Sequence, residues 1–260
     1  MIGRAAAGAV VALLIALLAR RSGVLSGTGA AAAVAVGTAS VAAGWDWGAL
    51  LILFFVSSSL LTRLGVEIKE ARTASIVAKG GARDAVQVAA NGGLFALFAL
   101  LSIAYPWDGW LAAGAGALAA AAADTWGTEL GTLAGGTPRH VISLRPVPAG
   151  TSGAVSPAGL AATVIGAAFM AASARMLGWP AATALAAFLG GVAGALADSL
   201  AGALFQARRR CPACASLTER AVHSCGTPTV HAGGVTWMNN DAVNALAAAV
   251  GALMAVLLVP

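Results

Sequence analysis

Two acidic residues, Asp124 and Glu129, end an apolar segment that is otherwise rich in alanine and glycine. A carboxylate near the centre of a bilayer costs roughly 2.5–3.5 kcal/mol on insertion scales, so it persists only where something offsets that cost. The loop that follows, about 135–153, is rich in glycine and threonine and carries basic residues. Backbone N–H groups and arginine side chains in such a loop can hold phosphate. Carboxylates beside this loop therefore predict metal-dependent phosphoryl chemistry.

Further polar residues lie inside later apolar segments. On a helix, Gly191, Gly194 and Asp198 share one face, so another helix can approach beside the carboxylate. Asp241 begins the last segment. Several acids with few cations at their depth favour a metal, and hard oxygen ligands favour Mg²⁺, which commonly bridges carboxylates to substrate phosphates. The alternative is that these groups only hydrogen-bond helices to one another.

Glu129 presents a problem of helical phase. It lies five residues after Asp124 and is therefore about 140° away on an ideal helix. We expect extra side-chain reach or an irregular turn at Gly127 to bring both carboxylates into one site.

A second group of candidate ligands follows the seventh apolar segment. Cys211 and Cys214 form a CxxC pair, and His223 and Cys225 follow closely. In a reducing compartment this Cys₃His pattern is typical of a possible structural zinc site, and free thiols are the alternative.

The composition identifies the environment of these residues. The 260 residues are 59% hydrophobic and only 10% charged, far from the soluble average of about 25% charged residues. The net charge of +5 does not indicate nucleic-acid binding, because the basic residues sit in separated loops without interleaved aromatics. We predict a single transmembrane domain, 1–260, whose partner is the lipid bilayer, with the Cys/His loop 207–235 inside it.

Eight apolar segments predict an all-α, polytopic membrane helical bundle. They span about residues 5–19, 24–43, 48–62, 85–105, 110–134, 157–177, 181–206 and 238–258. Basic residues concentrate in the loops after segments one, three, five and seven, and five tryptophans lie on the other side. By the positive-inside rule, the large loops after helices 3, 5 and 7 are cytoplasmic and both termini lie outside. We expect a multi-pass protein of a prokaryotic plasma membrane.

This topology also gives the depth of the polar residues. Asp198 lies ten residues before Arg208, about 15 Å along a helix. Asp124, Asn91 and Asp241 are similarly close to basic loops. The intramembrane acids and amides therefore gather in the cytoplasmic half, so a site there would face the cytoplasm.

Several ordered motifs cover most of the chain. They are Ser59-Leu60-Leu61-Thr62-Arg63 with Lys69, Gly81-Ala82-Arg83-Asp84 through Asn91-Gly92-Gly93, Asp124-Thr125-Trp126-Gly127-Thr128-Glu129-Leu130-Gly131, Pro138-Arg139, Val147-Pro148-Ala149-Gly150-Thr151, Gly194 through Asp198-Ser199 to Gln206, and Asn239-Asn240-Asp241 with Asn244. Together they resemble the integral membrane family that includes plant phytyl-phosphate kinase and animal transmembrane protein 19. One departure is Ser152, where the family carries asparagine in Gly-Thr-Asn-Gly-Gly.

The resemblance implies transfer of a nucleotide γ-phosphoryl group, with CTP favoured, to a prenyl (phytyl-like) monophosphate. It implies Asp124, Asp198 and Arg83 as catalytic residues, and Asp124, Glu129, Asp198 and Asp241 as ligands of one or two Mg²⁺. The expected phosphate- and nucleotide-binding residues are Lys69, Lys79, Arg83, Asn91, Arg139, Arg145, Gly150, Thr151, Ser152, Gly153, Asn239, Asn240 and Asn244. Phosphoryl transfer relies mainly on positioning and charge stabilisation, so no base is required.

Two other functions remain open from the sequence. A CTP-dependent lipid cytidylyltransferase would release pyrophosphate, whereas a kinase releases a nucleoside diphosphate. A cation- or proton-coupled transporter would also contain intramembrane acids and broken helices, but its acids should lie near the midplane.

Overall fold

The computed structural model describes residues 2–78 and 81–259, so the candidate Lys79 lies outside the described residues. Within these ranges the chain forms eight long helices and one short helix. They are α1 (Ile2–Arg21), α2 (Gly27–Ala43), α3 (Trp45–Arg63), the short α4 (Val66–Thr73), α5 (Ala85–Ala104), α6 (Gly109–Ala134), α7 (Pro157–Met176), α8 (Ala181–Leu204) and α9 (Asn240–Leu257). The eight long helices coincide with the eight predicted segments, and the prediction of an all-α polytopic membrane bundle is confirmed.

Six of the described helices are long and apolar enough to cross a membrane: α1, α3, α5, α7, α8 and α9. The helix α2 is apolar but shorter. The helix α6 is outside this set, yet it is buried on every side from Ala112 to Ala123. It contacts α3, α5, α7, α8 and α9. A helix that is apolar all round belongs in the interior, so α6 is the central helix that carries Asp124 and Glu129 into the bundle.

Small residues allow this close packing. A Cβ on Gly251 of α9 would lie 2.6 Å from the Gly116 carbonyl oxygen of α6. A Cβ on Gly194 of α8 would lie 2.4 Å from the Ala120 Cβ and 2.6 Å from the Ala247 carbonyl oxygen. The expected approach of a helix beside Asp198 is therefore present, and it is made by α6 and α9.

Replacing Gly251 by alanine is expected to lower the free energy of unfolding by about 1–3 kcal/mol, because two backbones must separate. The matched control is Gly93→Ala in α5, where the new Cβ would meet only the Ala89 Cβ at 3.8 Å. SDS-induced unfolding in detergent micelles measures both variants. Equal stability of the two would show that the α6–α9 contact is not tight.

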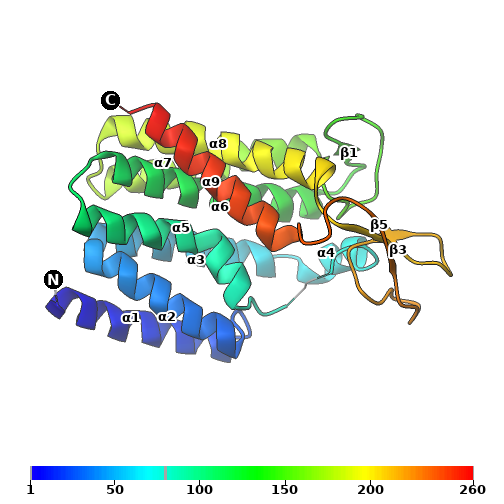
Figure 1. The fold of residues 1–260 in the computed structure, drawn as a ribbon, viewed down its shortest axis with the longest axis horizontal. Helices are drawn as coiled ribbons and strands as arrows, with labels where there is room; N and C mark the ends of the chain where they lie inside the picture. The colour runs from blue at the N-terminus through cyan, green and yellow to red at the C-terminus, as the bar shows by residue number, and fades with distance from the viewer. Residues whose placement is uncertain (1, 79–80, 260) are drawn as a thin grey trace.

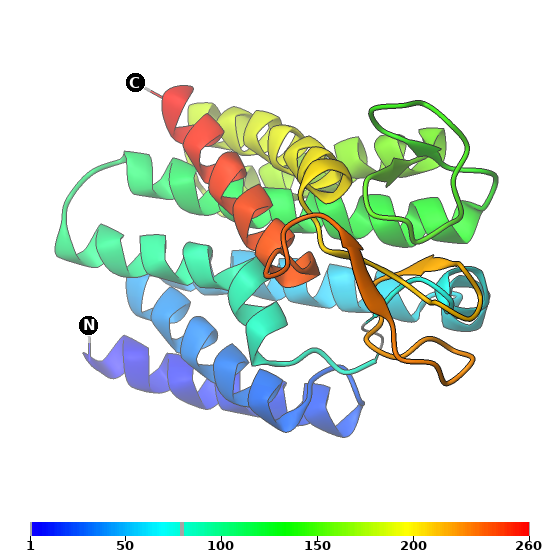
Figure 2. The same cartoon turned by 45° about the vertical axis from the view of Figure 1, so that its right-hand side comes forward.

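The polar connections gather at one end of the bundle, opposite both termini (Figure 1). They contain α4 and five short strands that the sequence did not predict: β1 (Arg139–His140), β2 (Ala154–Val155), β3 (Arg208–Arg210), β4 (Leu217–Thr218) and β5 (Val230–Gly233). β1 pairs antiparallel with β2, and a second antiparallel sheet has the order β4-β3-β5. Figure 2 shows the second sheet lying over this end, beside α4. The loops predicted to be cytoplasmic thus form one surface.

Side-chain caps begin α5 and α9 at this polar end. Asp84 forms a capping box with Gln87 at the start of α5. The Asn239 side chain accepts a hydrogen bond from the Ala242 N–H at 3.0 Å at the start of α9. These caps satisfy N–H groups that a helix leaves unpaired, and they fix where Asn91 and Asp241 stand.

Two tryptophans at the opposite end are buried rather than facing lipid. Trp47 packs against Phe95 and Trp179, with ring centroids 4.9 and 5.0 Å away. The Trp179 Nε1–H donates to Asp46 Oδ2 at 2.6 Å. Trp47 and Trp179 are each 3% exposed and therefore close the interior of the bundle at this end.

Candidate active site

Two cavities meet at the carboxylates of the central helix. One has a volume of about 390 Å³ and the other about 610 Å³. Asp124, Thr128 and Glu129 of α6 and Asp198 of α8 line both cavities. A group held at these side chains is thus in contact with the contents of both spaces.

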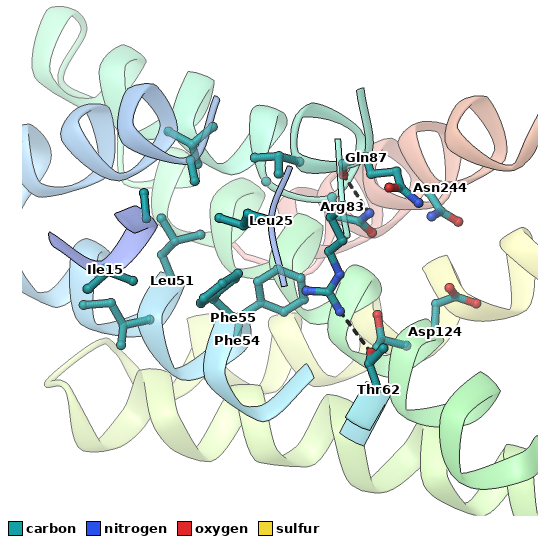
Figure 3. A pocket seen from close by; sticks show the side chains of 18 of the residues that line it. Ile15, Leu25, Leu51, Phe54, Phe55, Thr62, Arg83, Gln87, Asp124 and Asn244 are labelled. Atoms are coloured by element: carbon teal, nitrogen blue, oxygen red, sulfur yellow. Dashed lines mark hydrogen bonds between the residues drawn. The ribbon is translucent and has the colours of Figure 1, made fainter. Parts of the chain in front are cut away.

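The smaller cavity has an apolar and a polar part. Its apolar lining comes from α1, the α1–α2 turn, α2 and α3, and includes Ile15, Leu25, Leu51, Phe54 and Phe55. Figure 3 shows these side chains on one side and Arg83, Gln87, Asp124 and Asn244 on the other. The cavity therefore suits an amphiphile with a hydrocarbon chain and an anionic head group.

The larger cavity lies at the polar end and is lined mainly by loops. The glycine-rich stretch 149–156 forms one side, and the start of α9 forms another through Asn239, Asn240 and Asp241. Arg72, Arg209 and Glu219 also line it. The positive φ angles of Gly150 (86°) and Gly153 (75°) show a backbone that favours glycine, as in loops that present N–H groups to anions.

Asp124 and Asp198 come within hydrogen-bonding contact of each other, although they lie on different helices. Asp198 Oδ1 is buried and has no hydrogen-bond partner among the described residues. Asp241 is 4% exposed and lines the larger cavity beside them. Two half-buried carboxyl groups in contact favour a proton or a cation between them, and all these donors are hard oxygens. The residues therefore fit Mg²⁺.

Glu129 enters the site without the predicted irregular turn. α6 is continuous through Gly127, whose missing side chain instead lets α7 approach, since a Cβ there would lie 2.3 Å from Thr163 Oγ1. Glu129 forms an ion pair with Lys69 of α4. The cavities extend around the end of α6, so Asp124 and Glu129 reach them from different faces. Of the two expected alternatives, the irregular turn at Gly127 is therefore absent.

Lys69 is almost fully occupied by protein acceptors. Its ammonium donates to the carbonyl oxygens of Leu61 at 2.7 Å and Thr62 at 2.8 Å, as well as to Glu129. These carbonyls end α3, where a cation is favourable. Lys69 is 7% exposed and lines both cavities. Lys69 therefore links α4 to the end of α3 and to Glu129 of α6, in addition to placing a positive charge at the site.

Arg83 combines a backbone and a side-chain role. Its N–H donates to the Val24 carbonyl at 2.9 Å, and its carbonyl accepts from the Ser26 N–H at 3.0 Å. Its guanidinium donates to Thr62 Oγ1 at 3.2 Å and to Ser59 Oγ at 3.4 Å. Burial lowers the pKa of Arg83, and the Glu129 carboxylate partly opposes this. The guanidinium keeps further donors for a ligand in the smaller cavity.

The other predicted phosphate-binding residues divide into two groups. Asn91 and Asn244 line the smaller cavity, Asn240 lines both, and Asn239 and the stretch Gly150–Gly153 line the larger. Arg139 and Arg145 are exposed and line neither cavity. Arg139 donates instead to the Leu144 carbonyl at 2.7 Å. The structure therefore does not bring these two arginines to either cavity, because the β1–β2 connection folds back on itself and holds them on its own surface; their role in phosphate binding stays a prediction.

The larger cavity is also lined by Arg72, Gln206, Arg209 and Glu219, which were not among the residues predicted from the sequence. Arg72 donates to the carbonyls of Thr132 and Leu133 at the end of α6. Arg209 donates to Thr229. The Glu219 carboxylate accepts from Gln206 at 2.7 Å. Only Gln206 stood in one of the sequence motifs. Arg72 lies in the short helix α4, Arg209 in the short strand β3 and Glu219 just after β4, and no sequence periodicity places these elements at the cavity.

Ser152, which stands where the family pattern has asparagine, makes a specific contact in this structure. Its hydroxyl donates to Glu219 Oε1 at 2.7 Å, the same oxygen that accepts from Gln206. Burial raises the pKa of Glu219, and the hydrogen bond from Ser152 opposes that rise. The hydroxyl therefore ties the glycine-rich stretch to the Cys/His loop 207–235.

Comparisons with known proteins agree with the motif resemblance. The family model described as "Integral membrane protein DUF92" matches residues 10–252. The chain is 32% identical over 263 residues to Protein PGR of Arabidopsis thaliana, covering 90% of this chain and 89% of that protein. It is 32% identical over 216 residues to the uncharacterized membrane protein MJ0933 of Methanocaldococcus jannaschii, covering 83% and 77%. No solved structure matches. The family predicted from the motifs is confirmed, and the chain belongs to the DUF92 family of integral membrane proteins.

Proposed function

We propose that the chain is a Mg²⁺-dependent prenyl-phosphate kinase that works at the cytoplasmic membrane face. The observation that carries this proposal is the pair of cavities sharing Asp124, Glu129 and Asp198, one amphiphilic and one polar. A prenyl monophosphate fits the first cavity, with its chain among α1, α2 and α3. A nucleoside triphosphate fits the second, against the stretch Gly150–Gly153.

The proposed reaction is a single phosphoryl transfer. An oxygen of the prenyl monophosphate attacks the γ-phosphorus, the bond from that phosphorus to the β,γ-bridging oxygen breaks, and a nucleoside diphosphate leaves. The products are a prenyl diphosphate and a nucleoside diphosphate. The attacking oxygen is already anionic, so the site needs charge stabilisation and alignment rather than a base.

The roles of the side chains follow from their positions. Asp124, Glu129, Asp198 and Asp241 would hold Mg²⁺, which neutralises developing charge on phosphate oxygens when it is bound. Arg83 orients the acceptor phosphate at the polar part of the smaller cavity. Asn240 lies where the cavities join. The family resemblance favours CTP as the donor, and by the positive-inside rule the basic loops support a site on the cytoplasmic side.

The test uses the purified full chain with Mg²⁺. Phytyl, geranylgeranyl and farnesyl monophosphates are each combined with CTP, ATP, GTP and UTP, and the products are identified by mass spectrometry. We expect a prenyl diphosphate together with a nucleoside diphosphate. A nucleotidyl-lipid with pyrophosphate would establish the cytidylyltransferase instead. No turnover in any combination would overturn the proposal, and Na⁺- or proton-driven uptake of solute into vesicles would then establish a transporter.

A further inference from the structure

Four potential metal ligands converge in the Cys/His loop 207–235. The ligand atoms of Cys211, Cys214, His223 and Cys225 all lie within 4.8 Å of one another. Cys211 and His223 are buried, whereas Cys214 and Cys225 are exposed. The four residues come from two turns of the loop, and neither turn belongs to the cavities described above.

The spacing of the sulfur atoms fits a tetrahedral metal rather than a disulfide. Cys211 Sγ and Cys225 Sγ are 3.6 Å apart. Zn–S bonds of about 2.3 Å at tetrahedral angles place two sulfur ligands about 3.8 Å apart. A disulfide would require about 2.05 Å. The cysteines therefore stand at the separation that a shared ion would give them.

The backbone around the first pair is already shaped for this geometry. Cys211 follows β3 directly, and its N–H donates to the Ser216 carbonyl at 3.0 Å. The Cys214 N–H donates to Cys211 Sγ at 3.5 Å. Ala215 has a φ of 57°, a left-handed conformation that closes the turn. An N–H directed at a sulfur stabilises a thiolate, which is the form that binds metal.

His223 is oriented by contacts at both ring nitrogens. Nδ1 lies 3.1 Å from Cys225 Sγ, among the other ligands. Nε2 lies 3.1 Å from Ser216 Oγ. With Nδ1 on the metal, Nε2 carries the proton and donates it to Ser216. Such an outer contact fixes the tautomer of a ligating histidine.

We propose that Cys211, Cys214, Cys225 and His223 Nδ1 bind one Zn²⁺ as a structural site. Four protein ligands complete a tetrahedron and leave no position for substrate. On binding, the thiols release their protons to solvent and no electron is transferred. This assignment does not depend on the proposed kinase activity.

The zinc would stabilise the part of the loop that walls the larger cavity. Next to the cluster, β4 leads into Glu219, whose N–H donates to the Ile76 carbonyl at 2.8 Å. Arg220 donates to the Ala74 carbonyl at 2.7 Å. The loop is thus docked on the segment after α4 by a few hydrogen bonds. A metal ion that joins Cys211 and Cys214 to His223 and Cys225 would hold together the two ends of the segment that contains Glu219, and so would keep Glu219 at the cavity.

The first test measures zinc in the full-length protein purified in detergent without chelators. We expect one zinc per chain by elemental mass spectrometry, and loss of at least about nine-tenths of it in Cys211→Ser, where a buried ligand is removed. The control is His231→Ala, an exposed histidine of β5 outside the cluster, which should retain full zinc. Wild-type protein without zinc, whether its thiols are free or joined in a disulfide, overturns the proposal.

A second test does not require the cysteine variant to fold. Titrating the wild-type holoprotein with an organomercurial should release zinc in proportion to the thiols that react, read with a chromogenic chelator. In Ser216→Ala we expect zinc to be retained but its affinity, measured by chelator competition, to fall by about 10–100-fold. An unchanged affinity would overturn the assignment of Nδ1 as the ligand atom. Metal release unconnected with thiol reaction would overturn the site itself.

Discussion

Replacing Asp198 by asparagine is expected to lower prenyl-phosphate phosphorylation by on the order of 10³-fold, or about 4 kcal/mol of transition-state stabilisation. The side chain keeps its size but loses the charge that would hold Mg²⁺ between the two cavities. Asp124→Asn should have a similar effect, because the two carboxyl groups are in contact. Initial rates with prenyl monophosphate and nucleotide across a range of Mg²⁺ concentrations measure both variants.

The matched control is Asp108→Asn. Asp108 is an exposed carboxylate that precedes the same central helix at its opposite end and caps it with no side-chain hydrogen bond. The phosphorylation rate of the Asp108→Asn variant should stay within about twofold of the wild type, because Asp108 is remote from both cavities. Asparagine keeps the size of the side chain and removes the repulsion between two like charges at Asp124, so the Asp198 variant should unfold no more easily than the wild type. Full Mg²⁺-dependent activity in Asp124→Asn and Asp198→Asn would refute their assignment as ligands.

Replacing Lys69 by methionine is expected to lower the free energy of unfolding by about 3 kcal/mol. The substitution leaves the Glu129 carboxylate without its ion-pair partner. It also removes the donor to two carbonyl oxygens at the end of α3. It should also release α4 from the mouth of the site, so activity should fall with stability. SDS-induced unfolding in detergent and the phosphorylation assay provide the two readouts.

A double variant separates these effects. Adding Glu129→Gln to Lys69→Met removes the unpaired charge, so part of the lost stability should return while activity stays low, because Glu129 is a proposed metal ligand. Glu67→Gln, an exposed carboxylate on the same short helix, should change stability by less than about 0.5 kcal/mol. If Lys69→Met is as stable as the wild type, the ion pair does not fasten α4.

The positions of the helices and the importance of the acidic residues within them could both be predicted from the sequence, because both depend on local apolar runs. Apolar runs bounded by arginine or tryptophan determine helices locally, and a carboxylate inside such a run, such as Asp198, is conspicuous because of its cost. The all-round burial of α6 follows from alanine and glycine between Ala112 and Ala123. Burial, however, depends on neighbours, and the sequence alone did not single out α6 as the central helix.

The loops could not be predicted in this way. Arg139 and Arg145 were expected at the site from their charge and their closeness to glycine, but Arg139 lies in the β1–β2 strand pair, and both side chains are exposed and line neither cavity. Glu219 lies at the cavity because of contacts to Ser152 and Gln206, which are distant in sequence. Hydrogen bonds between loops depend on the assembled fold, and no local periodicity records them.

The backbone pairing of Arg83 with Val24 and Ser26 has a mechanical consequence. The α1–α2 turn supplies Leu25 to the wall of the apolar space, and the same turn holds the residue whose guanidinium faces the polar part. Gly29 lies so close to the Arg83 carbonyl that a Cβ would come within 2.0 Å of it. The first helical hairpin and Arg83 are therefore joined through their backbones, so a displacement of the hairpin would also displace the Arg83 guanidinium from the polar part of the smaller cavity.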